Sequence, residues 1–125
     1  MTDTRPMPSG VRSYLFAPGN HPRKVEKVFT AGADAILLDL EDAVPPKEKI
    51  ATRAVVVAAM RAPRRARGYV RVNGLDTEWC ADDIAAVAGP WLDGLVLPKV
   101  ESAEQVRQAS AWIAAAERAA GLPIG

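Results

Sequence analysis

Four short apolar runs, each followed by a helical pattern, constrain the fold of this chain more than any other feature. The apolar runs span residues 12–16, 35–40, 69–72 and 92–97, and the helical patterns span residues 21–31, 47–60, 78–88 and 102–120. The run from Ala35 to Leu40 reads Ala-Ile-Leu-Leu-Asp-Leu, which is typical of a strand buried on both faces of a parallel sheet. This repeated order predicts an α/β fold with parallel strands and outer helices.

Two architectures fit this order of elements: an open doubly wound sheet and part of a (β/α)8 barrel. A complete barrel needs about 250 residues, and the chain has 125. No glycine-rich GxGxxG motif follows the first strand, so the dinucleotide-binding form of the open sheet loses its main support. Residues 1–10 are polar and contain prolines, which predicts a flexible tail before a single domain over residues 11–125.

The charge balance and the single cysteine bear on partners and location. Because 16 basic and 15 acidic side chains leave a formal net charge of +1, we expect no binding to nucleic acid or to a membrane surface. Arginines cluster around Pro63 without interleaved aromatic residues, which favours a solvated loop; they are Arg61, Arg64, Arg65 and Arg67. The lone Cys80 cannot form an internal disulfide, so a cytoplasmic location is expected.

Charged and polar side chains gather where three of the apolar runs end. They are Asp39, Glu41 and Asp42 at the second run, Arg71 and Asn73 at the third, and Lys99 and Glu101 after the fourth. In parallel α/β folds the carboxyl ends of the strands share one face, and that face holds the active site. Structural ion pairs explain any one of these residues equally well, but their repetition over three strand ends predicts a ligand site.

The residue types at these ends suggest what the ligand is. The guanidinium of Arg71 offers a rigid fork that suits a carboxylate, and the carboxylates suit Mg²⁺, which prefers oxygen ligands. Together they describe an anionic oxo-acid held against a metal, where an enolate can be stabilised. The only histidine is His21 and no Ser-His-Asp or Cys-His set is visible, which weakens covalent acyl transfer as a mechanism.

Four motifs of the chain resemble those of a known family. They are Arg-Ser-Tyr-Leu-Phe-Ala-Pro-Gly at residues 12–19, Leu-Asp-Leu-Glu-Asp-Ala-Val at 38–44, Val-Arg-Val-Asn-Gly-Leu-Asp at 70–76 and Leu-Pro-Lys-Val-Glu-Ser at 97–102. Their order and spacing are similar to those of the citrate lyase β-subunit-like family. This family belongs to the HpcH/HpaI aldolase group and includes malyl-CoA and citramalyl-CoA lyases.

The resemblance implies the N-terminal half of a TIM-type (β/α)8 barrel. It implies a carbon–carbon lyase that cleaves a citramalyl-, malyl- or citryl-type CoA thioester into an oxo-acid and an acyl thioester, through an enolate stabilised by Mg²⁺. In the family's pattern Arg71 grips the oxo-acid, Glu41 and Asp42 lie near the metal and its waters, and Arg71 and Asp42 are the catalytic residues. Asp39, Asn73, Lys99 and Glu101 are then expected to line the site.

The family's pattern also implies where the thioester and the metal bind. Phe16, His21 and Lys27 match the region that meets the CoA thioester, although the family commonly has an arginine where this chain has His21. The family's direct metal ligands follow its fifth and sixth strands. We therefore expect no direct ligand within the chain, since both would lie beyond Gly125.

Two alternatives to a CoA-ester lyase stay open. One is a non-catalytic or partner-dependent half-barrel, which a complementing chain would complete. The other is an aldolase that acts on free 2-oxo-acids. For the complete enzyme the family resemblance favours a homo-oligomer.

Overall fold

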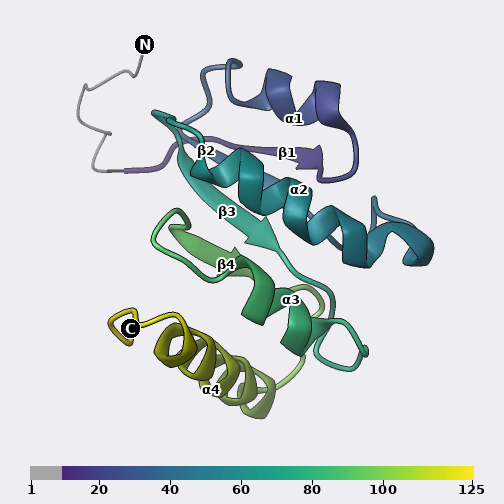
Figure 1. Ribbon diagram of the computed structural model, residues 1–125, viewed down its shortest axis with the longest axis vertical. Coiled ribbons are helices and arrows are strands. Elements are labelled where there is room, and N and C mark those ends of the chain that lie inside the picture. Colours follow the sequence, from purple (N-terminus) through teal and green to yellow (C-terminus); the bar gives the residue numbers. More distant parts are fainter. Residues whose placement is uncertain (1–9) are drawn as a thin grey trace.

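The computed structural model describes residues 10–125 and consists of one parallel sheet with α-helices packed beside it (Figure 1). In chain order the elements are β1 (Tyr14–Pro18), α1 (Pro22–Val28), β2 (Ala35–Asp39), η1 (Pro46–Glu48), α2 (Lys49–Arg61), β3 (Arg67–Arg71), α3 (Cys80–Val87), β4 (Gly94–Val96) and α4 (Ala103–Ala119). The strands lie in the order β1-β2-β3-β4 and all pair in parallel. The predicted α/β fold class is confirmed. The unreversed strand order is that of a barrel segment, because a doubly wound sheet reverses its order at a switch point.

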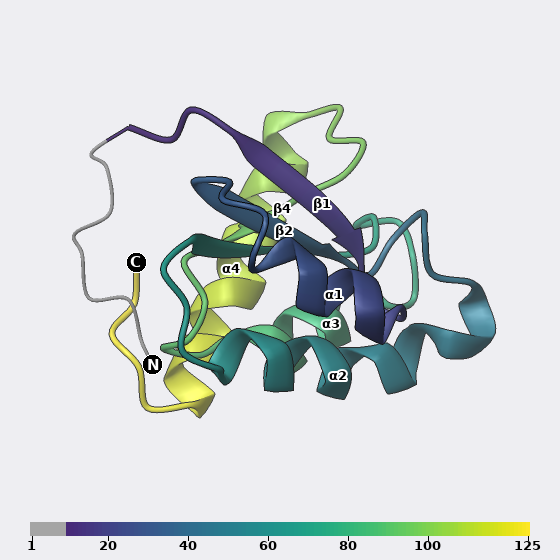
Figure 2. The same cartoon turned by 90° about the horizontal axis from the view of Figure 1, so that it is seen from above.

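The hydrophobic core lies between the sheet and the helices. Ile36, Leu38 and Val70 are fully buried and belong to the same cluster as Val56 of α2 and Ile84 of α3. Figure 2 shows α1 and α2 stacked on one side of β1 and β2. Because successive side chains of a strand alternate between faces, the residues between the core positions line the other face of the sheet.

That other face carries aromatic side chains near the amino end of the strands. The rings of Tyr14 and Tyr69 lie 6.1 Å apart between centroids. Tyr14 and Phe16 on this face of β1 are 58% and 49% exposed, and Leu15, which alternates to the helix-facing side, is 40% exposed. The helix-facing side of β2 and β3 is therefore covered, whereas the edge strand β1 keeps large apolar side chains at the surface.

Most element boundaries differ from the sequence prediction by one to three residues, and two of these differences have a clear local reason. The first strand begins at Tyr14 instead of Arg12, because the Arg12 guanidinium and backbone amide are engaged by the Asp34 carboxylate. The first helix ends at Val28 instead of residue 31, where the Thr30 hydroxyl donates to the Lys27 carbonyl. By contrast, the predicted cap of α4 is present, since the Ser102 hydroxyl accepts a hydrogen bond from the Gln105 amide.

The arginine-rich corner between α2 and β3 is not simply the solvated loop that the sequence suggests. The Arg64 side chain is only 14% exposed, and its guanidinium donates to the carbonyls of Met60, Ala66 and Trp91 and to the Asp93 carboxylate. Arg64 therefore ties the end of α2 to the segment that leads into β4.

No helix within residues 10–125 has the length and apolar character of a membrane span.

Gly19 lies where β1 approaches the end of β2 too closely for a side chain. Its amide donates to the Asp39 carbonyl at 2.9 Å, and a Cβ atom here would lie 2.6 Å from that oxygen and 2.7 Å from Cγ2 of Val56. The absence of a side chain thus permits the contact that places Asp39.

We expect Gly19→Ala to lower the free energy of unfolding by about 1–3 kcal/mol, because the added methyl group overpacks this contact. Urea denaturation of the full chain measures the effect. Gly10→Ala is the matched control, since a Cβ atom at Gly10 meets nothing within 4 Å. Equal unfolding free energies for the two variants would contradict the close approach at Gly19.

Candidate active site

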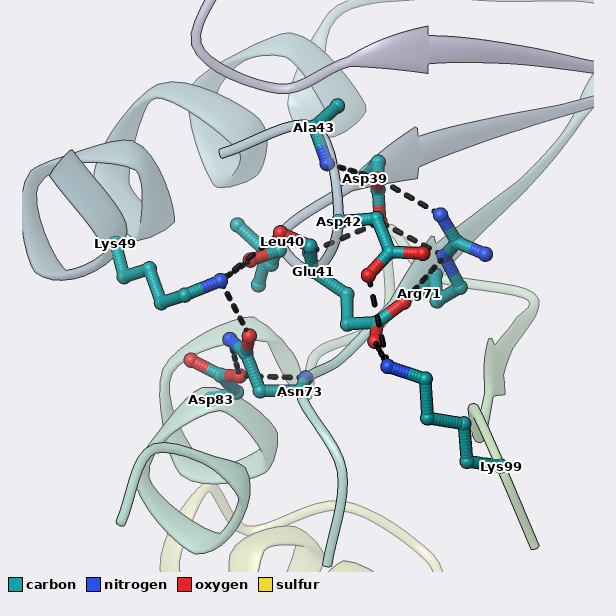
Figure 3. Close-up of polar contacts among 10 residues, drawn as sticks. All are labelled: Asp39, Leu40, Glu41, Asp42, Ala43, Lys49, Arg71, Asn73, Asp83 and Lys99. Carbon is teal, nitrogen blue, oxygen red and sulfur yellow. Dashed lines mark hydrogen bonds and ion pairs between the residues drawn. The ribbon is translucent and has the colours of Figure 1, made fainter. Parts of the chain in front are cut away.

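The Asp39 carboxylate is the centre of the polar cluster at the carboxyl end of the sheet (Figure 3). Asp39 ends β2 and pairs in register with Arg71, which ends β3. The Arg71 guanidinium donates from Nε to Oδ1 and from Nη2 to Oδ2, both at 2.9 Å. The backbone amides of Glu41 and Ala43 donate to the same carboxylate at 2.9 and 3.1 Å. Asp39 therefore fixes both the arginine and the loop that follows β2.

These contacts determine how Asp39 ionises. Burial acts to raise the pKa of Asp39, but the hydrogen bonds from Arg71 and from the two amides outweigh it and hold that pKa below its ordinary value. The Asp39 hydrogen bond in turn raises the pKa of Arg71, against the effect of partial burial. The pair is accordingly fully charged at neutral pH.

Arg71 is held on a second side by an aromatic ring. Its guanidinium carbon lies 4.9 Å from the ring centroid of Phe16, which is within the range of a cation–π contact. The Arg71 side chain remains 24% exposed, and no residue in the described part of the chain accepts a hydrogen bond from its Nη1. Nη1 of Arg71 thus remains available to a ligand, while the edge of the guanidinium formed by Nε and Nη2 is fixed by Asp39.

Glu41 lies between two cations and keeps one oxygen without a hydrogen bond. Its side chain is 8% exposed, and Oε2 accepts from Lys99 Nζ at 2.9 Å. Oε1 is buried without a hydrogen-bond partner, 3.6 Å from Arg71 Nε. An unpaired buried acceptor is costly, so this oxygen marks a position where a donor from a ligand or its water would be favourable.

Asp42 and Lys99 form the exposed rim of the cluster. Asp42 is 65% exposed, and its carboxylate lies 3.6 Å from Lys99 Nζ. The pKa of Lys99 is raised, first by its hydrogen bond to Glu41 and then by the charge of Asp42. Lys99 also has a backbone φ of 54°, a left-handed conformation that costs a non-glycine residue about 1–3 kcal/mol and is concentrated at functional sites.

A buried network behind this cluster joins the ends of β2 and β3. Lys49 Nζ donates to Asn73 Oδ1 at 2.6 Å, and the Asn73 side chain and amide both donate to Asp83 Oδ2. Asp83 also accepts from Arg53 Nε at 2.8 Å. The sequence placed Asn73 at the site but missed Lys49, Arg53 and Asp83. The signal for Lys49 was its place on the buried stripe of α2, three residues before Thr52.

The other residues expected at the site divide into two groups. Phe16 and Lys27 line a shared hollow of about 210 Å³ beside β1 and α1. His21 is exposed at the start of α1 and makes no side-chain cap hydrogen bond. Glu101 is exposed, and its backbone amide donates to the Gln105 side chain. The structure thus brings together all the predicted strand-end residues except Glu101, and it leaves His21 outside the hollow.

A second hollow of about 380 Å³ opens beside the acidic loop. Its lining includes Glu41, Asp42, Lys49, Trp79 and Lys99. The oxygen-rich loop suits a hard cation, but Asp39 is fully engaged, and no group of three or more His, Cys, Asp or Glu residues within residues 10–125 is arranged to hold a metal ion. Glu41 and Asp42 therefore fit a supporting role, in which they accept hydrogen bonds from the waters of Mg²⁺.

Four parallel strands in sequential order, with Arg71 and acidic residues at their carboxyl ends, are typical of part of an α/β barrel. The HpcH/HpaI aldolase/citrate lyase family matches the chain over residues 12–124. The chain belongs to this family.

Curated relatives include lyases and a thioesterase. The chain is 48% identical over 99 residues to a (3S)-malyl-CoA thioesterase of Cereibacter sphaeroides, covering 77% of this chain and 34% of the relative. It is 39% identical over 116 residues to the citrate lyase subunit beta of Leuconostoc mesenteroides, covering 91% and 38%. It is 43% identical over 115 residues to an L-malyl-CoA/beta-methylmalyl-CoA lyase of C. sphaeroides, covering 88% and 36%. The chain thus spans little more than a third of the length of these relatives.

Solved structures from Mycobacterium tuberculosis share the fold. A citrate lyase beta subunit complexed with oxaloacetate and magnesium matches with a TM-score of 0.67 and 32% identity, covering 87% of this chain and 55% of that one. The protein CitE in complex with magnesium, acetoacetate and coenzyme A matches with a TM-score of 0.65 and 34% identity, covering 82% and 44%. These neighbours have bound magnesium, as their descriptions state.

The lowered pKa of Asp39 predicts how stability depends on pH. A carboxyl group with a depressed pKa contributes stability above its unfolded pKa of about 3.9, and this contribution is lost as the pH falls through the folded pKa. We therefore expect Asp39→Asn to lower the free energy of unfolding by about 3 kcal/mol at pH 7, because it leaves Arg71 without its partner. The deficit relative to the wild type should shrink at pH 3.

Urea denaturation at the two pH values measures this difference. Asp82→Asn is the control, because Asp82 is an exposed acid in the first turn of α3. A deficit of the same size at both pH values would show that the charge of Asp39 does not stabilise the fold.

Proposed function

We propose that the protein is a Mg²⁺-dependent carbon–carbon lyase that cleaves a hydroxyacyl-CoA of the malyl, citramalyl or citryl type into an oxo-acid and an acyl thioester. The observation that carries this proposal is the Arg71 fork, held by Asp39 on one edge and by Phe16 on one face. A guanidinium fixed in this way binds a carboxylate with little loss of side-chain freedom. Family membership and the CoA-ester lyases among the relatives support the same class.

The residues of the chain take separate parts in this reaction. Arg71 binds the carboxylate of the oxo-acid portion through Nη1 and remains paired with Asp39. Phe16 and Lys27 contact the thioester portion from their shared hollow, whereas the exposed His21 lies outside that hollow. Asp42 is the exposed acid of the loop, and we place it with Arg71 among the catalytic residues. Asn73 and Lys99 line the site, and Glu101 lies outside it at the start of α4.

The cleavage itself requires that developing negative charge be accommodated. The hydroxyl group of the substrate loses its proton, the adjacent carbon–carbon bond breaks, and the electron pair moves into the thioester as an enolate, which takes up a proton to give the acyl thioester. When bound, Mg²⁺ supplies a Lewis acid for the oxygens that carry this charge. Glu41 and Asp42 would accept hydrogen bonds from its waters, and its direct ligands are expected outside residues 10–125.

A second candidate activity, thioester hydrolysis, has one specific observation in its favour. The relative with 48% identity is a (3S)-malyl-CoA thioesterase. Mass spectrometry of the products separates the two activities, since malyl-CoA gives acetyl-CoA and glyoxylate by carbon–carbon cleavage but malate and free CoA by hydrolysis. Turnover of free hydroxy-acids without CoA would instead indicate the 2-oxo-acid aldolase. No turnover with Mg²⁺ by protein purified from its source would indicate the non-catalytic half-barrel.

We propose that residues 11–125 form the N-terminal half of the barrel and that further strands, from a longer chain or a complementing one, cover its edges. The exposed apolar side chains of β1 support this arrangement, because an uncovered apolar edge strand is an aggregation hazard.

We also propose that the protein is a homo-oligomer in the cytoplasm. The formal net charge of +1 provides no overall field that would drive binding to nucleic acid or to a membrane surface.

Arg71→Lys tests the fork directly, because lysine keeps the charge but offers no bidentate geometry. We expect kcat/KM for malyl-CoA to fall by roughly 100-fold or more, which corresponds to about 3 kcal/mol of lost transition-state binding. Steady-state kinetics with the active protein measures the loss. Arg118→Lys is the matched control on the exposed end of α4, and an unchanged kcat/KM for Arg71→Lys would remove Arg71 from the mechanism.

A further inference from the structure

Lys49 is a buried cation that has no carboxylate partner. It is 6% exposed at the first residue of α2, and no ion pair joins it to an acid anywhere in residues 10–125. Its three donors are all used, by the carbonyls of Leu40 and Glu41 at 3.1 and 2.9 Å and by Asn73 Oδ1 at 2.6 Å. Burying an ammonium group costs several kcal/mol. Three acceptors that converge on one buried lysine offset this cost and indicate a specific structural role.

The two carbonyls belong to the loop that carries Glu41 and Asp42. On its other side, the amides of Glu41 and Ala43 are held by the Asp39 carboxylate. The loop is therefore fixed through its carbonyls by Lys49 and through its amides by Asp39 (Figure 3). With both sides of the backbone held, the Glu41 side chain lies toward Arg71 and Lys99.

The third acceptor connects this loop to the neighbouring strand end. Asn73 lies two residues after Arg71, and its own position is set by the buried Asp83 carboxylate. Lys49 thus bridges the acidic loop after β2 and the segment after β3, which directly follows Arg71. A fixed distance between Arg71 and Glu41 is what a site for an oxo-acid and a hydrated cation needs.

We infer that Lys49 is a positioning residue, which holds the acidic loop in register with Arg71 and thereby sets the affinity of the site for Mg²⁺. This inference rests on the proposed function for its catalytic consequence. The fixation of the loop does not depend on that function, so the two can be tested separately.

Hydrogen exchange of the full chain tests the fixation of the loop. Lys49→Met keeps the length of the apolar stem but removes the three donors, and we expect the amides of Glu41 and Ala43 to exchange about tenfold faster or more, while the β2 interior stays protected. Lys47→Met is the matched control, because Lys47 is exposed in η1 two residues before Lys49. Unchanged exchange at Glu41 and Ala43 in Lys49→Met would overturn the inference.

Kinetics of the active protein tests the consequence for the site. The Mg²⁺ concentration for half-maximal activity should rise roughly 10- to 100-fold in Lys49→Met, with little change in the KM for the thioester, whereas a loss of folded protein alone would lower kcat and leave the Mg²⁺ dependence unchanged. An unaltered Mg²⁺ dependence despite faster exchange would refute the effect on affinity. If the wild type turns over no CoA ester at all, the proposed function fails, and the exchange data alone decide the role of Lys49.

The Cys80 thiol reports whether each variant is folded. It is fully buried, and burial, together with the charges of Asp83 and Asp76, raises its pKa to about 11, so a thiol reagent at pH 8 reaches it only after unfolding. If Lys49→Met fails this check, NMR of the wild type decides. A fixed, triply bonded ammonium gives a persistent ¹⁵N–¹H signal at neutral pH, and loss of the Lys49 signal to rapid solvent exchange would contradict the inference.

Discussion

The ion pair between Asp39 and Arg71 is the contact on which the arrangement of the site depends. It exists only because β2 and β3 pair in parallel with these two residues side by side, and a slip of one residue would turn Arg71 to the opposite face. The same carboxylate orders the following loop through two amides. A buried acid is tolerated when every oxygen is satisfied, and Asp39 meets this condition with partners that are themselves parts of the site.

The distribution of charge leaves Arg71 able to bind an anion without giving up its partner. Asp39 occupies Nε and Nη2, Lys99 is attracted to Glu41 and Asp42, and Arg53 neutralises Asp83. An incoming carboxylate therefore meets a guanidinium whose position is already set and whose Nη1 is available. This arrangement favours binding, because the conformational entropy of the Arg71 side chain is lost when the protein folds and not when the ligand binds.

The sequence allowed the sheet, its helices and the strand-end cluster to be predicted, because these follow from apolar runs and from where charges interrupt them. The run at residues 35–40 became a fully buried strand, and Arg71 and Asp39 met as parallel pairing requires. The roles of Lys49 and Arg64 could not be predicted in the same way. Arg64 looks like an ordinary surface cation in sequence, and helical spacing alone places Lys49 on the buried stripe of α2 without naming its partners. The contacts of both come from carbonyl groups that only the tertiary structure brings together.

The open face of the sheet and the open side of the site have the same cause. Barrel interiors are filled by layers of side chains from alternate strands, and Phe16 belongs to the uncovered layer of the sheet while it also holds the guanidinium of Arg71. The side of the sheet toward the helices is closed by its own core, so the described elements position Asp39 and Arg71 without further strands. Additional barrel strands would form the opposite wall of the site. They would thereby exclude water, which strengthens every charged contact in the cluster.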